Sequence, residues 1–257
     1  MNSPDVGIPD GGPPSGGAHL TDSYPADSHP AEPHPADPST DRGPSSPRDW
    51  MLRLRPNTSA EALQARLMEA ERVSLENTFA TLAADSSLSL AAGLILASRR
   101  KYIAGAGKSA AYAALLNADL AATLPNVMLI GAGPSATDVL SDVRPTDVCI
   151  VFSLRRYRTE TVRLGRLFAR SGGRLVVVSD DRQAPLAACA SVLILVDTGS
   201  VSFADSPTAM AAVCHLLSSV ASASAKGARR RLANRDTATS ALGIYWDECD
   251  QESERIS

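Results

Sequence analysis

KYIAGAGKSAAYAALLNADL, residues 101–120, has the pattern of a strand followed by a helix, because a short apolar run passes through a glycine-rich turn into an alanine-rich segment of helical length. Four more short runs rich in valine, isoleucine and leucine follow, at residues 126–131, 147–153, 173–180 and 191–197. Nearly continuous apolar runs that alternate with helices are typical of a parallel sheet covered on both faces. The pattern therefore predicts an α/β fold with a five-stranded parallel sheet.

The segments around these runs have the length and spacing of helices. They lie at residues 109–124, 134–142, 159–171 and 184–190, with a longer alanine-rich helix at 206–225. Two more helices are expected before the first strand, one that begins near Thr58 with Ser59 as its cap and one at about 87–98. The predicted fold is a doubly wound α-β-α sandwich with the flavodoxin-like strand order and an N-terminal helical pair.

The chain is expected to have four parts. Residues 1–57 are rich in proline and glycine and poor in apolar side chains, so we expect a disordered tail. The N-terminal helices occupy residues 58–98 and the α/β domain residues 99–227. A weaker helix and an acidic tail occupy residues 228–257.

Composition and charge exclude several functional classes. The net charge of −3 gives no global field that favours nucleic acid or a membrane surface. No apolar run approaches the ~20 residues that span a bilayer, and the N-terminus lacks the basic and apolar regions of a signal peptide. The four cysteines are widely spaced and form no CxxC pair, which is typical of reduced thiols. We therefore expect a cytoplasmic protein.

A ligand is expected where the first and third strands end. In an open parallel sheet, ligands bind beyond the carboxyl ends of the strands, at the point where the strand order reverses. The helix N-terminus after the first strand offers backbone N–H groups, and the arginines after the third strand bind phosphate or carboxylate. The candidate ligand-binding residues are Gly105, Gly107 and Ser109 on the first loop, and Ser153, Arg155 and Arg156 on the second.

These residues also have structural interpretations that the sequence leaves open. Ser109 has the position of a helix cap, with or without a role in ligand binding. Arg155 and Arg156 are either ligand contacts, solvated side chains, or partners of an acid such as Asp180 or Asp181 or of a second subunit. An arginine that is partly buried at this position needs an anionic partner, either a ligand or a carboxylate.

Two familiar nucleotide motifs do not fit. A Walker A loop needs glycine where Tyr102 stands. The loop GAGKSA fits the loose dinucleotide pattern G-x-G-x-x-A, but no acid follows the second strand to bind the ribose. We therefore expect no cofactor, and the sequence shows no metal-ligand spacing.

Taken together, several segments resemble a SIS (sugar isomerase) domain, and most of all the ligand domain of RpiR/MurR-type transcriptional regulators. They are YIAGAGKSAAYAALLNADLAATLPNVMLIG, DVCIVFS, GRLVVVSDDRQAPLAACASVLILV and SPTAMAAVCHLL. The resemblance identifies residues 99–227 as the SIS domain. It implies a phosphosugar ligand near the interface of a homodimer, with Ser109 matching the serine of the first loop.

The sequence departs from that family in two places. The family motif S-x-S-G-x-T after the third strand is matched at Ser153, but Arg155, Arg156 and Arg158 replace its second serine, its glycine and its threonine. Thr159 substitutes for the threonine only if the loop is longer. The N-terminal tail shows no recognition-helix pattern, which argues against DNA binding, so transcriptional regulation would need a partner or DNA contacts made elsewhere.

No set of catalytic residues converges in the sequence. Glu160 is the only acid expected beside the crevice, either as a proton-transfer base or, as we prefer, as a first-turn carboxylate of the next helix. His215 lies in an apolar helix, where a packed or interface role is preferred to catalysis. The preferred hypothesis is a sensor or accessory module that binds a sugar-phosphate-like anion; the alternative is a phosphosugar isomerase or a related enzyme.

Overall fold

The structure is a computed structural model that describes residues 59–245. The predictions of a disordered tail at residues 1–57 and of an acidic C-terminal tail concern segments that lie outside the described residues.

Five parallel strands form a single sheet in the order β2-β1-β3-β4-β5. Their bounds are Lys101–Gly105 (β1), Val127–Leu129 (β2), Val148–Phe152 (β3), Arg174–Ser179 (β4) and Val192–Leu195 (β5). Each strand coincides with a predicted apolar run. The predicted five-stranded parallel sheet and its flavodoxin-like order are confirmed.

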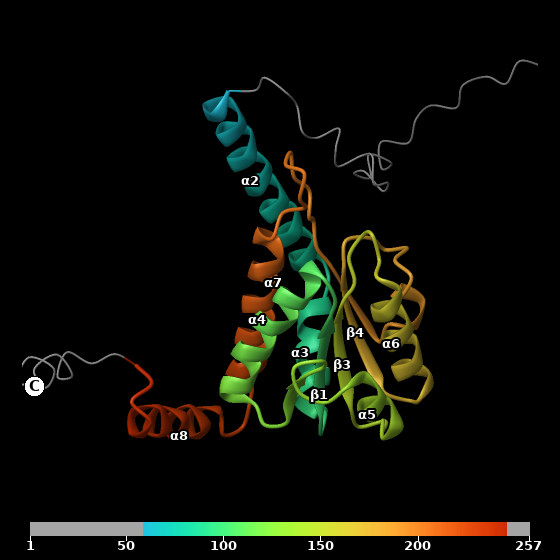
Figure 1. Cartoon of the computed structure of the whole chain (residues 1–257), viewed down its shortest axis with the longest axis vertical. Coiled ribbons are helices and arrows are strands. Elements are labelled where there is room, and N and C mark those ends of the chain that lie inside the picture. Colours follow the sequence, from blue (N-terminus) through green and yellow to red (C-terminus); the bar gives the residue numbers. More distant parts are fainter. Residues whose placement is uncertain (1–58, 246–257) are drawn as a thin grey trace, which may run out of the picture. The chain divides into compact units, whose positions relative to one another are not determined.

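Helices precede, separate and follow the strands (Figure 1). Two come first, α2 (Ala60–Ala84) and α3 (Ser87–Ala97), and Ser59 caps α2 by accepting a hydrogen bond from the backbone N of Ala62 at 3.2 Å. The others are α4 (Lys108–Thr123), α5 (Ala136–Ser141), α6 (Thr159–Arg170), α7 (Thr208–Ala223) and α8 (Ala228–Ala241).

Helices α3, α4 and α7 cover one face of the sheet, on the left of Figure 1. The core on this side joins strand residues such as Ile103 and Ile150 to Leu116 of α4 and Leu217 of α7, all completely buried. Because these helices hold alanine, leucine and valine at helical spacing, they bury an apolar stripe against the sheet.

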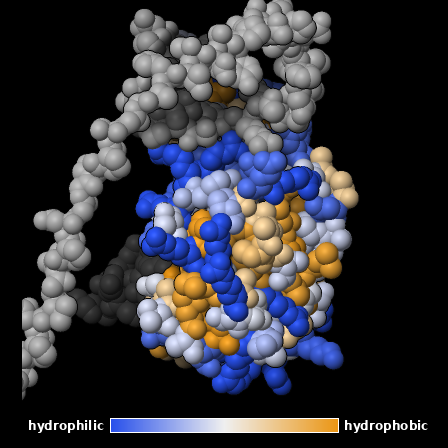
Figure 2. Space-filling model, turned by 90° about the vertical axis from the view of Figure 1, so that its right-hand side faces the viewer, coloured by the Kyte–Doolittle hydropathy of each residue, from blue (hydrophilic) through white to orange (hydrophobic). Residues whose placement is uncertain are grey.

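Helices α5 and α6 cover the opposite face with a thinner layer. The core here joins Val151 and Val177 of the sheet to Phe168 of α6 and to Leu186. Figure 2 looks onto this side, where apolar surface is visible between hydrophilic residues. The sheet therefore has helices and a buried core on both faces, which confirms the doubly wound α-β-α architecture.

One predicted helix is wrong. Residues 184–190 form only a 3₁₀ turn at Ala187–Cys189, because Pro185 disfavours the helical conformation of the residue before it and β5 begins at Val192. Between residues 59 and 245, no individual helix combines the length and the apolar character needed to cross a membrane. Cys149, Cys189 and Cys214 are free thiols.

Candidate functional site

The carboxyl ends of β1 and β3 lie side by side. Gly105, the last residue of β1, pairs in register with Phe152, the last residue of β3. The loop 105–107 therefore runs beside the loop that begins at Ser153. Because strand order reverses between these strands, the two loops meet at the position where the sequence predicts a ligand.

Two glycines let the first loop approach its neighbours. A Cβ on Gly105 would lie 2.4 Å from the backbone O of Ser109, so no other residue allows α4 to begin this close to the strand. Gly107 precedes α4 with a φ of +61°, and a Cβ there would lie 2.6 Å from Nη2 of Arg158. The absence of a side chain on Gly107 therefore lets the guanidinium of Arg158 lie against the N-terminus of α4.

Ser153 is the most distinctive residue of the site. Both backbone polar groups of Ser153 are hydrogen-bonded. Its N donates to the carbonyl O of Val178 at 3.0 Å, and its carbonyl O accepts from the Oγ of Ser179 at 2.7 Å. Its own Oγ is buried and has no hydrogen-bond partner among the described residues. A buried hydroxyl without a partner is costly, so a ligand atom that bonds to it would remove that cost.

Ser109 does not cap α4. Gly107 occupies the cap position without a side-chain bond, and Ser109 is the second residue of the helix and buried. The interpretation of Ser109 as a cap is therefore wrong, because the helix begins one residue earlier than predicted. The backbone N of Ala110 donates to the carbonyl O of Gly107 at 3.1 Å. The amides of Lys108 and Ser109, before it, lie at the start of the helix, where N–H groups suit an anion.

The three arginines of the second loop have different environments. Arg155 is half-buried and paired with two carboxylates: Nε lies 3.5 Å from Oδ2 of Asp180, and Nη2 lies 3.5 Å from Oδ2 of Asp181. Arg156 is exposed. Arg158 is exposed too, but its guanidinium lies against Gly107.

Asp180 lies largely buried at the end of β4, beside the second loop. Its side chain is 10% exposed, and burial raises the pKa of this carboxyl while Arg155 lowers it. The hydroxyl of Tyr157 donates to Oδ1 of Asp180 at 3.4 Å, and burial together with the Asp180 charge raises the pKa of Tyr157 to about 12. The backbone N of Arg155 also donates to Oδ1 at 3.2 Å, so the loop is fastened to the end of β4 through this carboxylate.

Two acids that the sequence did not indicate also reach this end of the sheet. The backbone carbonyl of Asp205 accepts a hydrogen bond from Nζ of Lys108, the first residue of α4. Glu71, on α2, accepts a hydrogen bond from the hydroxyl of Ser206 just before α7. Burial, aided by the charges of Asp205 and Glu71, raises the pKa of Tyr112 to about 12. No local pattern relates α2 to the loop before α7, so only their packing reveals this cluster.

The predicted catalytic candidates lie at the edge of the site or outside it. Glu160 is in the first turn of α6, exposed, with Oε1 at 3.8 Å from Nη1 of Arg158, as the preferred first-turn interpretation expects. The expectation that Glu160 is the only acid beside the crevice is wrong, since Asp180 and Asp181 lie closer to the loop. Thr159 begins α6 and is exposed. His215 lies in the middle of α7 and is exposed, so no residue between 59 and 245 packs over it, and its interface role stays a prediction.

The arrangement suits an anion better than a metal ion. The hydroxyl of Ser153, the first amides of α4 and the guanidinium of Arg158 come from the two loops that meet at this end of the sheet. Within residues 59–245, no three His, Cys, Asp or Glu side chains gather as a metal site requires.

Comparison with known proteins identifies the family of the α/β domain. The family model for the SIS domain matches residues 94–220. No curated protein matches the chain significantly.

Solved structures with a similar fold include two bacterial regulators. The sugar isomerase domain of an RpiR transcription factor from Sphaerobacter thermophilus is 24% identical, with a TM-score of 0.61, and the match covers 67% of this chain and 94% of that one. NanR of Vibrio vulnificus, complexed with ManNAc-6P, is 15% identical, with a TM-score of 0.58, over 70% of this chain and 69% of that one. At these identities the likeness establishes the fold.

Proposed function

Because residues 94–220 form a SIS domain, we propose that this chain binds a small anionic ligand of the sugar-phosphate class and acts as a sensor or accessory module. The ligand's phosphate occupies the crevice between the β1 and β3 loops. The observation that carries this proposal is the buried hydroxyl of Ser153, which has no partner among residues 59–245. Further support comes from NanR, which has a similar fold and was solved with a sugar phosphate.

The residues of the site have separate roles in this proposal. Ser153 Oγ donates to a phosphate oxygen, and the first amides of α4 donate to others. Arg158 lies against Gly107 and neutralises the anion from the solvent side. Arg155 holds the loop in place through Asp180 and Asp181 and contributes to binding indirectly.

The proposal is tested by calorimetric titration of the full chain with hexose and N-acetylhexosamine 6-phosphates. Ser153→Ala should weaken the binding of the best ligand about ten- to a hundredfold, because a hydrogen bond to a charged group contributes about 1.5–3 kcal/mol. Ser171→Ala is the matched control, since Ser171 is exposed in the turn after α6. Equal affinities of the two variants would contradict the proposed site.

A phosphosugar isomerase is the second candidate, and Asp180 is the observation that favours it. A carboxyl whose pKa is raised by burial suits proton transfer between neighbouring carbons of a sugar. Turnover of a phosphosugar, followed by NMR and abolished in Asp180→Asn, would assign this activity. If a phosphosugar binds but is not converted, the result favours the sensor function over the isomerase.

We also propose that the chain forms a homodimer through the N-terminal helices. Large apolar side chains are exposed on α2 and α3: Leu63, Met68, Val73, Phe79 and Leu90. The first half of α2 projects beyond the carboxyl ends of the strands in Figure 1, where a second copy has access to it. Helix α7 contributes less to the proposed interface, because this helix packs against α2, α3 and α4 of its own chain.

A further inference from the structure

Helix α8 begins with an unusual concentration of positive charge. Arg229, Arg230 and Arg231 stand in its first turn, which contains no acid, and Gly227 precedes the helix with a φ of +82° and no side-chain cap. The N-terminus of a helix already bears partial positive charge and normally attracts carboxylates. The arginines therefore add to the positive potential of the helix end.

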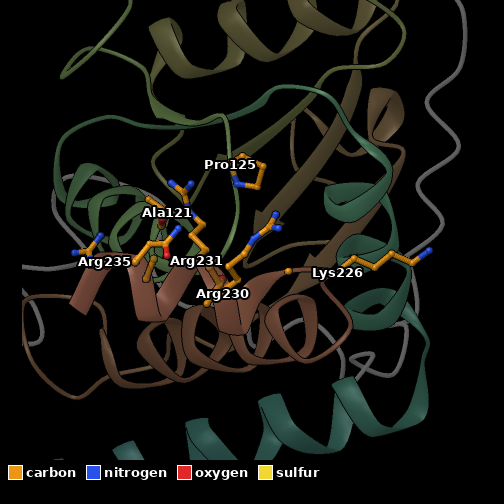
Figure 3. A pocket seen from close by; sticks show the side chains of 10 residues that line it. Ala121, Pro125, Lys226, Arg230, Arg231 and Arg235 are labelled. Carbon is orange, nitrogen blue, oxygen red and sulfur yellow. Dashed lines mark hydrogen bonds between the residues drawn. The ribbon is translucent and has the colours of Figure 1, made fainter. Parts of the chain in front are cut away.

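Two of these arginines, Arg230 and Arg231, line a pocket together with two further cations. A pocket of about 420 Å³ lies between α8 and the end of α4, and its charged lining residues are Lys226, Arg230, Arg231 and Arg235. Asn234 adds an amide, Ala121 and Pro125 contribute to the opposite wall, and no lining residue is acidic. Figure 3 shows Arg230 and Arg231 reaching from α8 toward the chain around Pro125, while Lys226 extends away from them.

The structure gives only one of these cations a role in the fold. Nε of Arg231 donates to the carbonyl O of Ala121 at 3.2 Å, in the last turn of α4, where helix carbonyls attract cations. Within residues 59–245, Lys226, Arg230, Arg231 and Arg235 make no ion pair with a carboxylate. Four like charges around one pocket repel each other unless an anion lies among them.

We propose that this pocket binds a small polyphosphate, a ligand that carries two or more phosphate groups in one molecule. Guanidinium groups bind phosphate oxygens in pairs, so several of them suit a ligand of several charges better than a single phosphate. The volume is that of a small-molecule site. The four cations are exposed and form one small cluster in a chain of net charge −3, whereas nucleic acid needs an extended basic surface.

This site is separate from the sugar-phosphate site. Helix α4 begins at Lys108 beside the crevice and ends at Thr123 beside the basic pocket, so its length of about 24 Å separates them. Helix α7 also starts near the crevice and ends near Lys226. The proposal stands on the arginines of α8 and does not depend on the ligand of the crevice.

Titration of the full chain with inorganic triphosphate, inorganic phosphate and a short DNA duplex tests the proposal. Triphosphate should bind at least tenfold more tightly than phosphate. The double variant Arg230→Gln/Arg235→Gln should bind triphosphate about ten- to a hundredfold more weakly for each arginine contact removed. Arg229→Gln is the matched control, because Arg229 lies on the same helix turn but does not line the pocket. Its affinity should stay within about twofold of the parent chain.

Several outcomes would overturn the proposal. The first is that triphosphate does not bind, and the second is that Arg229→Gln lowers the affinity for triphosphate as much as the double variant does. The third is that DNA binds more tightly than triphosphate and that the double variant weakens both equally. A loss caused by Ser153→Ala with no loss in the double variant would assign triphosphate to the crevice. Circular dichroism of each variant verifies that α8 is still folded.

Discussion

At the scale of single residues, Arg155 and Arg156 differ more than their adjacent positions indicate. Both were predicted to supply charge to an anion. Arg155 lies between Asp180 and Asp181, with its side chain 19% exposed, whereas Arg156 is exposed to solvent. A carboxylate such as Asp180, which is largely buried, needs this partner because a buried charge without one is costly.

Arg155→Ala should therefore lower the free energy of unfolding by about 1–3 kcal/mol, because it leaves the Asp180 carboxylate without its guanidinium. Arg156→Ala is the control on the same loop and should change it by less than about 0.5 kcal/mol. Urea denaturation of both variants measures the difference. If the two variants unfold at the same urea concentration, the ion pairs of Arg155 do not stabilise the loop.

At the scale of the elements, the turn from β1 to α4 requires a glycine at Gly105, whereas α3 has room for a side chain at Gly93. Gly105 stands where the helix returns against the strand, and a Cβ would meet the backbone of Ser109 at 2.4 Å. Gly93 lies inside α3, and a Cβ there has no other atom within 4 Å. The same substitution should therefore have opposite effects at the two positions.

Gly105→Ala should destabilise the chain by about 1–3 kcal/mol or more, because backbone atoms must move to admit the methyl group. Gly93→Ala should stabilise it by about 0.5–1 kcal/mol, since alanine loses less conformational freedom in a helix than glycine does. Thermal unfolding of both variants checks the two signs. A stabilised Gly105→Ala would mean that the site loop adapts easily, and would weaken the argument for a preformed anion site.

At the scale of the whole molecule, the exposed apolar side chains of α2 have no cover within residues 59–245. Met68 is 65% exposed. If α2 forms the homodimer interface, Met68→Glu should convert the dimer into a monomer at micromolar concentration, because a charge would be buried against apolar surface. Light scattering after size-exclusion chromatography measures the mass. Leu242→Glu is the control, since Leu242 is 73% exposed beyond α8. A monomeric parent chain would contradict the dimer.

The order of strands and helices, the layered α/β architecture and the two loops that meet at the candidate site could all be predicted from the sequence. These features follow from apolar periodicity and from glycines within short segments, which act on neighbouring residues. Local patterns were insufficient where proline changed the outcome, as at residues 184–190.

Which charged side chains meet became evident from the three-dimensional structure. Arg155 pairs with Asp180, Glu71 reaches Ser206, and the arginines of α8 face the end of α4. The partners in each pair are separated by 25 to 135 residues along the chain. The physical reason is that an ion pair or a hydrogen bond depends on distances of a few ångströms, and those distances are set by how whole elements pack rather than by the residues next to each charge.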